Sequence, residues 1–193
     1  KNLLNNVKME FKKGDIVGVM GESGTGKSTL LKLIPKFRET DGIYINDIPI
    51  SEIKNKDYLR KVSYYSQNTP IITDTLYNNL NFGRKKVSKA IYEAMPFLAK
   101  FTNLDEMIVE NGANLSGGDK QRIALSRYFT EDADIVILDE PTSSLDKETE
   151  EELMKEILKD TKDKIVFIIS HNKEIMKYCS HLVEVKNKTA TVL

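Results

Sequence analysis

The sequence predicts an α/β fold with a mostly parallel sheet, and two patterns support that prediction. Short apolar segments alternate with helical patterns along most of the chain, as expected where each strand is followed by a helix. Two of these segments, 135–138 and 165–169, are continuously apolar, which is typical of parallel strands buried on both faces. The full set of expected strands covers residues 16–20, 43–46, 62–66, 135–138, 165–170 and 182–185.

Length and composition limit the classes of protein that fit. The chain has 193 residues, of which 40% are hydrophobic and 30% charged, and this balance excludes a disordered chain. Its 29 basic and 29 acidic residues give a formal net charge of zero, so we expect no nucleic-acid partner, since such domains usually have a pI above about 9. The single cysteine, Cys179, excludes an internal disulfide and is expected to be a small buried side chain.

Helices are expected on both sides of a region that interrupts the strand–helix alternation. Residues 27–34 form a helix ended by Pro35, and residues 146–159 form one with Asp146 as its N-cap. The intervening segment is mostly helical, most clearly at 88–95 and 118–129. We therefore expect one domain over residues 1–193. It consists of an α/β core at 1–69 and 131–193 and an inserted helical subdomain at 70–130.

A glycine-rich loop follows the first expected strand. Residues 21–29 read GESGTGKST and fit the P-loop pattern G-x-x-x-x-G-K-[ST], whose backbone N–H groups wrap phosphate oxygens. In such a loop Lys27 reaches the β- and γ-phosphates, and the Ser28 hydroxyl binds Mg²⁺. The alternative is a plain turn with an exposed lysine. The predicted nucleotide contacts are Gly21, Glu22, Ser23, Gly24, Thr25, Gly26, Lys27, Ser28 and Thr29.

Two acidic residues follow the buried strand at 135–138. In open parallel sheets ligands bind at the carboxyl ends of strands, so Asp139 is placed to hold Mg²⁺ and Glu140 to orient or deprotonate an attacking water. The simpler alternative is a solvated acidic turn before Pro141. The P-loop upstream favours the metal and catalytic interpretation.

Residues 115–122, LSGGDKQR, closely resemble LSGGQ, the signature of ATP-binding cassette (ABC) ATPases. The resemblance extends along the chain. Gln67, in VSYYSQN, stands where that family has its glutamine loop. Residues 143–146 resemble the family's D-loop, and His171 follows the fifth expected strand, as the family's switch histidine does.

The resemblance implies a role for each of these residues. Gln67 would contact Mg²⁺ or water and act as a catalytic residue together with Glu140 and His171. Asp146 would lie across a dimer interface. A helix that opens on Ser116, Gly117 and Gly118 offers a hydroxyl and uncovered N–H groups, and these would bind the γ-phosphate held by the opposite subunit.

Each residue also has an ordinary structural explanation. A glutamine after a strand is often a solvated loop residue, and a lone histidine such as His171 is often exposed. Asp146 could serve only as an N-cap, and the two roles are compatible. Ser116 and the two glycines after it could form a loop with a capping serine.

Among ABC proteins the sequence resembles the exporter type. The run VENGANLSGG is similar to the exporter segment V-G-E-x-G-x-x-LSGG, with Glu110 and Gly112 retained. The resemblance implies an ATPase that uses ATP and Mg²⁺ and powers transport through ATP-driven head-to-tail dimerisation. The implied partners are a second copy of the domain and the transmembrane domain of the same transporter. The implied location is the cytoplasmic face of the membrane, and peptides or bacteriocins are the expected cargo.

Three other functions fit parts of the pattern. The first alternative is a soluble non-transport ABC ATPase for DNA repair or translation, although the balanced charge and the lack of a coiled-coil insertion argue against it. A non-hydrolysing interaction module would not need Glu140 and His171. A simple P-loop kinase would not need the signature or the D-loop.

Two departures from the family pattern lead to expectations of their own. Asp119 stands where the signature usually has glutamine, and we expect its carboxylate to disfavour dimer closure unless Lys120 or Mg²⁺ offsets it. The chain begins with Lys1, and we expect a piece truncated at both ends and cut from a longer membrane transporter. Since Phe11 lies inside an apparent strand, we expect the adenine-stacking aromatic of the family to be missing or substituted.

Overall fold

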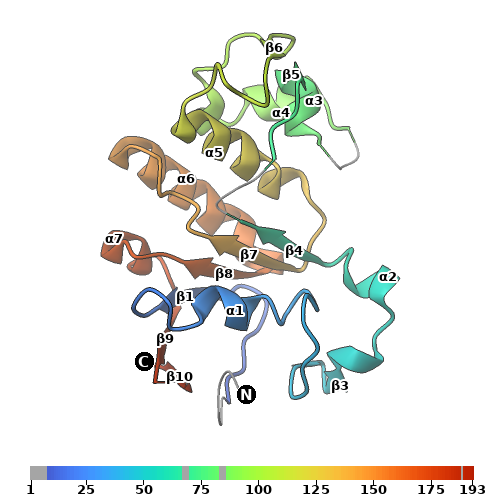
Figure 1. Ribbon diagram of the computed structural model, residues 1–193, viewed down its shortest axis with the longest axis vertical. Coiled ribbons are helices and arrows are strands. Elements are labelled where there is room, and N and C mark those ends of the chain that lie inside the picture. The colour runs from blue at the N-terminus through green and yellow to red at the C-terminus, as the bar shows by residue number, and fades with distance from the viewer. Residues whose placement is uncertain (1–7, 67–69, 83–85, 188) are drawn as a thin grey trace. The chain divides into compact units, whose positions relative to one another are not determined.

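A computed structural model of the chain describes residues 8–66, 70–82, 86–187 and 189–193. The chain divides into two compact units (Figure 1). The first unit consists of Lys1–Tyr64, Asp132–Glu140 and Thr161–Leu193. The second unit consists of Tyr65–Glu131 and Pro141–Asp160.

The first unit is built on the main sheet, whose strand order is β10-β9-β1-β8-β7-β4. Strand β1 pairs in parallel with both β8 and β9, and β7 pairs in parallel with β8. The last strand, β10, is antiparallel to its neighbour β9. The expected α/β fold with a mostly parallel sheet is confirmed. The strands are β1 (Ile16–Met20), β4 (Val62–Tyr65), β7 (Ile135–Asp139), β8 (Ile165–Ile169), β9 (His181–Lys186) and β10 (Thr189–Val192).

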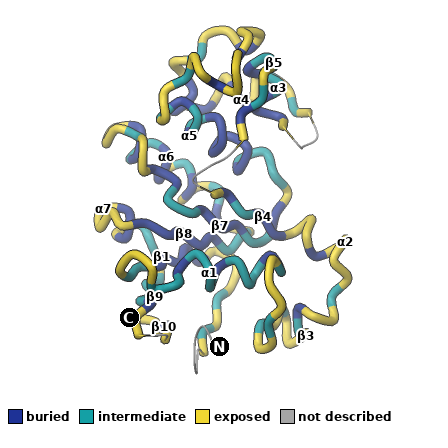
Figure 2. The backbone as a smooth tube through the Cα atoms, in the orientation of Figure 1, coloured by how far each residue is buried: buried dark blue, intermediate teal, exposed yellow. Residues whose placement is uncertain are grey.

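The central strands are buried because both faces of the sheet are apolar. Figure 2 colours much of β1, β7 and β8 as buried, and Val17, Ile137 and Ile168 have no exposed surface. This is the environment that the continuous apolar runs of β7 and β8 predict. Their carboxyl ends are therefore held rigidly, which suits a site built at those ends.

Short elements complete the first unit. Helix α1 is shorter than expected and ends at Leu31, because Leu33 and Ile34 donate to carbonyls only three residues back, before Pro35. Strand β2 (Tyr44–Ile45) lies within the strand expected at 43–46, and it forms a small hairpin with β3 (Ile48–Pro49), which the sequence did not predict. The other elements are α1 (Lys27–Leu31), η1 (Ile50–Glu52), α2 (Asn55–Tyr58), η4 (Thr161–Asp163) and α7 (Lys173–Met176).

The expected strand around Phe11 is wrong for the residues described there. No strand is assigned to residues 8–13. The Phe11 ring instead packs edge-on against Phe167 of β8, with 5.5 Å between ring centroids, and against His181 at 5.7 Å. The Phe11 side chain is partly buried against the core, so its apolar character serves packing rather than strand pairing.

The second unit is mostly helical. Its core residues include Leu80 of α3, Tyr92 of α4 and Ile123 of α5, all almost fully buried. Arg127 is buried too, and its Nε donates to the carbonyl oxygen of Asn79 at 3.0 Å. The elements are β5 (Asp74–Thr75), α3 (Leu76–Leu80), α4 (Lys89–Glu93), η2 (Pro96–Leu98), β6 (Met107–Ile108), α5 (Gly117–Ser126), η3 (Tyr128–Thr130) and α6 (Lys147–Asp160).

Pro141–Asp160, which contains α6, belongs to the second unit. The boundaries predicted from the sequence place this stretch in the P-loop core. The subdomain boundaries of 70–130 therefore stay a prediction. Side chains of α5 form hydrogen bonds with residues of Pro141–Asp160.

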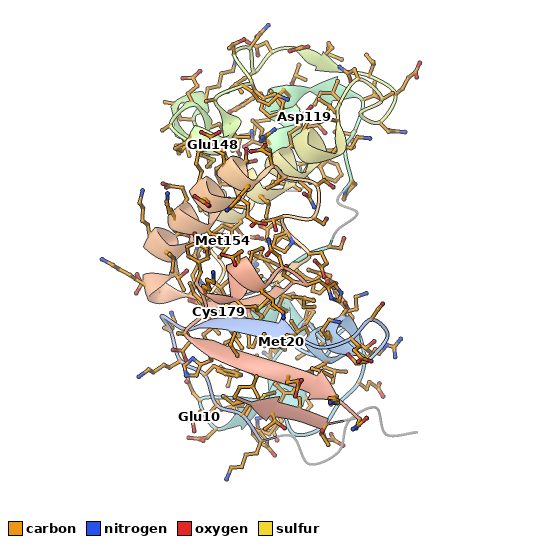
Figure 3. All side chains as sticks on the ribbon, turned by 90° about the vertical axis from the view of Figure 1, so that its left-hand side faces the viewer. Glu10, Met20, Asp119, Glu148, Met154 and Cys179 are labelled. Carbon is orange, nitrogen blue, oxygen red and sulfur yellow. The ribbon has the colours of Figure 1, made fainter. Side chains whose placement is uncertain are left out.

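The single cysteine packs against the main sheet. Cys179 (Figure 3) lies against β1, where a Cβ added to Gly18 would be 2.9 Å from its Sγ, and burial raises the pKa of the thiol to about 11. The sequence predicted a small buried side chain, and Cys179 is half-buried. Within the described parts of the chain, we find no helix that combines the length and apolar character needed to cross a membrane.

Candidate nucleotide-binding site and signature helix

The glycine-rich loop connects β1 to α1 within the first unit. Gly21 has a φ of 148°, and a Cβ there would lie 2.4 Å from the carbonyl oxygen of Val185 in β9. Only glycine fits this close approach of two backbones. Gly26, at the N-cap of α1, has a φ of 102° and turns the chain into the helix.

Lys27 is buried beneath this loop. Its Nζ donates to the carbonyl oxygens of Gly21 and Glu22, each at 2.8 Å. Thr25 Oγ1 also donates to the Glu22 carbonyl, at 2.9 Å. The lysine is thus held folded inside the loop by two neutral acceptors. An anion such as phosphate is a stronger hydrogen-bond acceptor than a carbonyl. The ammonium group of Lys27 is therefore placed to leave the two carbonyl oxygens and donate to a phosphate instead.

The two residues predicted to bind Mg²⁺ from this loop and from the end of β7 lie side by side. Ser28 Oγ is 3.2 Å from Asp139 Oδ1, and the Tyr64 hydroxyl donates to Asp139 Oδ2 at 2.5 Å. Burial, followed by this hydrogen bond, raises the pKa of Tyr64, so its hydroxyl stays a donor. A hydroxyl and a carboxylate are hard oxygen ligands, and Mg²⁺ commonly takes only one or two of them beside waters and phosphates. These residues fit the ion.

Glu140 adopts a left-handed backbone conformation, with a φ of 53°. Its N–H donates to the carbonyl oxygen of Ile169 at 2.9 Å, which anchors this uncommon conformation to the end of β8. Its Oε1 lies 3.4 Å from His171 Nε2. Burial raises the pKa of Glu140, although nearby His171 and Lys27 partly offset the effect. A carboxylate with a raised pKa is a better proton acceptor.

The first unit brings Ser28 close to Asp139 and Glu140 close to His171, and Lys27 lies near enough to Glu140 to influence its pKa. The roles predicted for these residues stay predictions. Gln67, the remaining predicted catalytic and metal-binding residue, lies outside the described residues.

In the second unit, the signature residues open helix α5. Ser116 is its N-cap, and its Oγ accepts from the N–H of Asp119 at 3.2 Å. Asp119 Oδ2 in turn accepts from Ser116 N at 3.1 Å and Ser116 Oγ at 2.7 Å, which completes a capping box. Ser116 and Gly117 are both exposed.

The D-loop residues are fastened to this helix. Gln121 donates to Ser143 Oγ and accepts from the N–H of Ser144, each at 2.8 Å. A Cβ on Gly118 would lie 2.8 Å from the Ser144 carbonyl oxygen, so glycine is required here for packing. The second glycine of the signature thus has a structural reason within the chain as well as its predicted role with phosphate.

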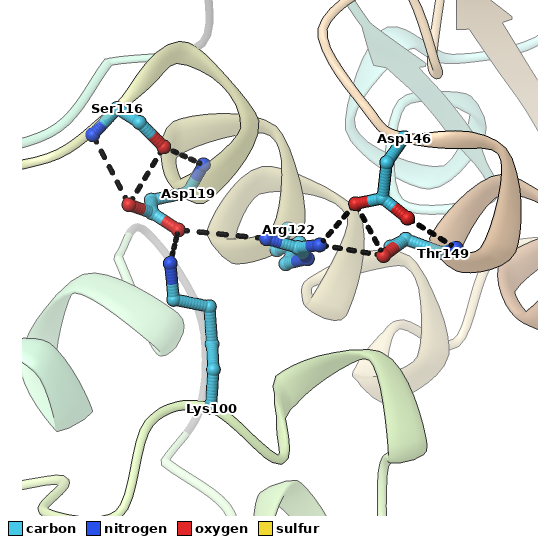
Figure 4. Close-up of polar contacts among 6 residues, drawn as sticks. All are labelled: Lys100, Ser116, Asp119, Arg122, Asp146 and Thr149. Carbon is cyan, nitrogen blue, oxygen red and sulfur yellow. Dashed lines mark hydrogen bonds and ion pairs between the residues drawn. The ribbon is translucent and has the colours of Figure 1, made fainter.

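Asp146 caps helix α6 as expected, accepting from Thr149 N at 3.0 Å. Arg122 of α5 donates to Asp146 Oδ2 at 2.9 Å and to Thr149 Oγ1 at 2.5 Å (Figure 4). The N-cap interpretation of Asp146 is confirmed. Its predicted place across a dimer interface stays a prediction.

Comparison with known proteins decides the family to which this chain belongs. Residues 4–143 match the family described as ABC transporter. The chain belongs to the ABC transporter family. A probable ABC transporter ATP-binding/permease protein of Haemophilus influenzae is 33% identical over 200 residues, which cover 97% of this chain and 36% of that protein. An ATP-dependent lipid A-core flippase of Wigglesworthia glossinidia brevipalpis is 36% identical over 185 residues, covering 90% of this chain and 32% of the flippase.

A solved structure gives the same family. A bacterial Atm1-family ABC exporter with ATP bound superposes with a TM-score of 0.89 and 25% identity, covering 98% of this chain and 35% of that one. The fold is that of an ABC exporter ATP-binding domain. The chain spans about a third of the length of these relatives.

Three residues of this ABC domain were not assigned a role from the sequence. Tyr64 stands three residues before Gln67, and the alternation within the strand VSYY could have placed it on the face toward Asp139. Arg122 lies on the signature helix, but its partner Asp146 is 24 residues away and only the fold brings them together. Lys100 gave no signal at all.

The residues that form ion pairs with Asp119 are not the lysine that the sequence suggested, and compensation by Mg²⁺ stays a prediction. The partners of Asp119 are Lys100, through a hydrogen-bonded ion pair with Oδ1, and Arg122, whose Nη1 is 3.6 Å from the same oxygen. The sequence suggested Lys120 or Mg²⁺ instead, because Lys120 is the next residue along the chain. Helical geometry places residue i+1 on another face and i+3 on the same one, which explains Arg122.

Proposed function

We propose that this chain is the ATP-binding and ATP-hydrolysing domain of an ABC exporter. The observation that supports this most is the 3.2 Å approach of Ser28, in the glycine-rich loop, to Asp139 at the end of β7. It joins a phosphate-binding loop to a carboxylate suited to Mg²⁺. ATP hydrolysis is the general activity of the family, and the related exporter structure is described as having ATP bound.

In this proposal the side chains of the first unit bind and orient ATP. The loop N–H groups and Lys27 would hold the phosphates, with Lys27 leaving the carbonyls of Gly21 and Glu22. Ser28 and Asp139 would hold Mg²⁺, with Gln67 as a further ligand; the ion neutralises charge on the phosphates when bound. Tyr64 would keep Asp139 oriented.

Glu140 would accept a proton from the attacking water, and His171 would donate a hydrogen bond to the γ-phosphate. Their separation of 3.4 Å lets both reach the same small region. The raised pKa of Glu140 favours proton acceptance near neutral pH.

Ser116, Gly117 and Gly118 would bind the γ-phosphate on a second copy of the chain, which makes ATP the link of a head-to-tail dimer. Asp146 would lie at the same interface. The start of helix α5, where Gly117 is exposed, offers donors to such an anion.

The partner of the dimer would be a transmembrane domain at the cytoplasmic face of a membrane, since relatives are named ATP-binding/permease proteins and flippases. These names favour a transporter over a soluble non-transport ATPase. The relatives named for a cargo are lipid A-core flippases. The expected peptide or bacteriocin cargo therefore stays a prediction.

The variant Glu140→Gln tests this function. We expect ATP hydrolysis to fall by roughly 10²- to 10⁴-fold, because the amide cannot accept the proton. ATP binding should persist, and a stable ATP-bound dimer should accumulate. Hydrolysis would be followed by phosphate release and dimerisation by light scattering.

The matched control is Glu148→Gln, the same chemical change at an exposed position of α6. It should hydrolyse ATP at the original rate. Unchanged hydrolysis in Glu140→Gln would refute the catalytic role, and a monomer at saturating ATP would refute the dimer.

A further inference from the structure

The first turn of helix α5 is surrounded by a cluster of four charged side chains, all in the second unit. Asp119 pairs with Lys100 and approaches Arg122 at 3.6 Å, and Arg122 donates to Asp146 at 2.9 Å. Figure 4 shows this chain of contacts continuing to Ser116 and Thr149. Two cations and two carboxylates give the cluster a net charge of zero.

Asp119 is the buried member of the cluster. Its side chain is 10% exposed, whereas that of Lys100 is 48% exposed. Burial by itself would raise the pKa of Asp119, but hydrogen bonds from Lys100 and Ser116 outweigh that effect and hold its pKa below the ordinary value. Asp119 is therefore a carboxylate at neutral pH, and Lys100 balances it from the solvent side.

The Asp119 carboxylate also engages the signature serine. Ser116 Oγ has a single proton and donates it to Asp119 Oδ2 at 2.7 Å. A phosphate that approaches Ser116 must compete for this proton with a carboxylate three residues away. The strength of the competition depends on how much negative charge the carboxylate presents, and Lys100 reduces that charge through its ion pair with Oδ1.

We propose that Lys100 is a positioning residue for the signature: by pairing with Asp119 it allows an acidic signature to accept the γ-phosphate of ATP bound to a second copy of the chain. The inference rests on the proposed function. A signature with glutamine at position 119 would have no carboxylate there. In this domain position 119 is aspartate, and Lys100, in the turn after η2, balances its negative charge. Without Lys100, the cluster would carry one net negative charge beside the Ser116 hydroxyl.

The experiment is a double-mutant cycle in the Glu140→Gln background of the full 193-residue chain. Lys100→Met removes the charge, which also lies 5.5 Å from the centroid of the Phe101 ring, and keeps an unbranched apolar side chain. Asp119→Gln removes the carboxylate, and glutamine is also a normal partner in a capping box, so the helix start is preserved. Lys100→Arg restores the charge. Two readouts are measured: ATP binding to the monomer, by a fluorescent ATP analogue, and the ATP concentration that half-saturates dimerisation.

We expect Lys100→Met to raise the half-saturating ATP concentration by about three- to tenfold while ATP binding to the monomer stays unchanged. Lys100→Arg should return to the original value. Asp119→Gln should dimerise at least as readily as the parent. When Asp119 is already glutamine, Lys100→Met should change dimerisation by less than about twofold, since there is no carboxylate left to expose.

The control is Lys89→Met. Lys89 lies on α4 of the same unit, away from the signature, and forms an ion pair with Asp105. It should leave both readouts unchanged. An equal effect of Lys100→Met in the aspartate and glutamine backgrounds, or no effect in either, would overturn the inference and leave the proposed function standing. If the Glu140→Gln parent does not dimerise with ATP, the proposed function fails and this inference fails with it.

Discussion

The two units prepare their polar groups in opposite ways. In the first unit, Lys27 is held by two carbonyl oxygens, and Ser28 meets Asp139 through a single 3.2 Å contact. In the second unit, Asp119 and Asp146 each have several short partners, including a cation. The first arrangement has binding capacity left for an anion and a metal ion. The second is complete within the chain and holds the start of helix α5 in a fixed shape.

This difference indicates which kind of ligand each unit can bind. A loop stabilised by neutral acceptors gains when a charged ligand replaces them. A helix end whose charges are already paired gains little by rearranging, so it serves best as a rigid surface for an anion brought by a partner. The predictions below, from the largest expected effect to the smallest, test whether the two units separate in this way.

The largest effect should come from Lys27→Ala in the first unit. It removes charge-assisted hydrogen bonds to phosphate and should weaken ATP binding to the monomer by about tenfold to a hundredfold. Titration with a fluorescent ATP analogue measures it. Ser116→Ala in the second unit is the contrasting variant and should leave monomer binding unchanged while it weakens dimerisation. If both variants weakened ATP binding to the monomer equally, the proposed difference between the two units would be wrong.

Tyr64→Phe should have a smaller and more specific effect. It removes the hydroxyl that donates to Asp139 Oδ2 at 2.5 Å and leaves the ring, which packs edge-on against Phe37 at 5.7 Å. Losing a partner that orients a metal ligand commonly lowers metal affinity by about tenfold or more. The Mg²⁺ concentration needed for half-maximal ATP hydrolysis should rise, whereas ATP binding measured without Mg²⁺ should not change.

Tyr44→Phe is the matched control for this variant, since it removes the hydroxyl of an exposed tyrosine on β2. Its Mg²⁺ dependence should be that of the original chain. A shift of the same size in both variants, or in neither, would rule out an orienting role for Tyr64.

The sequence predicted the first unit better than the second, and the reason is physical. The strands β7 and β8 carry continuous apolar runs, and β1 is apolar apart from Gly18. The glycine-rich loop, Asp139 and His171 lie at or soon after the ends of these strands in the sequence. A parallel sheet brings such ends together, so the sequence alone could pair Ser28 with Asp139. The antiparallel β10 was missed because TATV is short and only weakly apolar.

In the second unit the important contacts join residues that no local pattern connects. Lys100 and Asp119 are 19 residues apart, and Lys100 lies in the turn after η2, outside every motif. The same holds for Arg122 and Asp146. Ion pairs of this kind depend on how short helices pack, and hydrophobic periodicity carries no information about which charged side chains will meet. Asp119 could be recognised as unusual, but its partner could not be named.

The smallest expected effect is a pH dependence that differs between the units. Burial raises the pKa of Glu140, so hydrolysis should begin to fall, on acidification, at a higher pH than an ordinary carboxylate would give. The pKa of Asp119 is lowered, so its charge persists to a pH below the ordinary carboxyl range. Hydrolysis measured against pH should therefore lose activity before the charge cluster around Asp119 changes.

The variant His171→Ala sharpens this test. The proximity of His171 lowers the pKa of Glu140, so its removal should raise that pKa further and move the acidic limb of the residual activity to higher pH. His181→Ala, whose ring instead packs against Phe11, should leave the limb in place. A limb that stays where it is in His171→Ala would mean that the rate depends on a group other than Glu140, because this carboxylate lies 3.4 Å from the histidine that the variant removes.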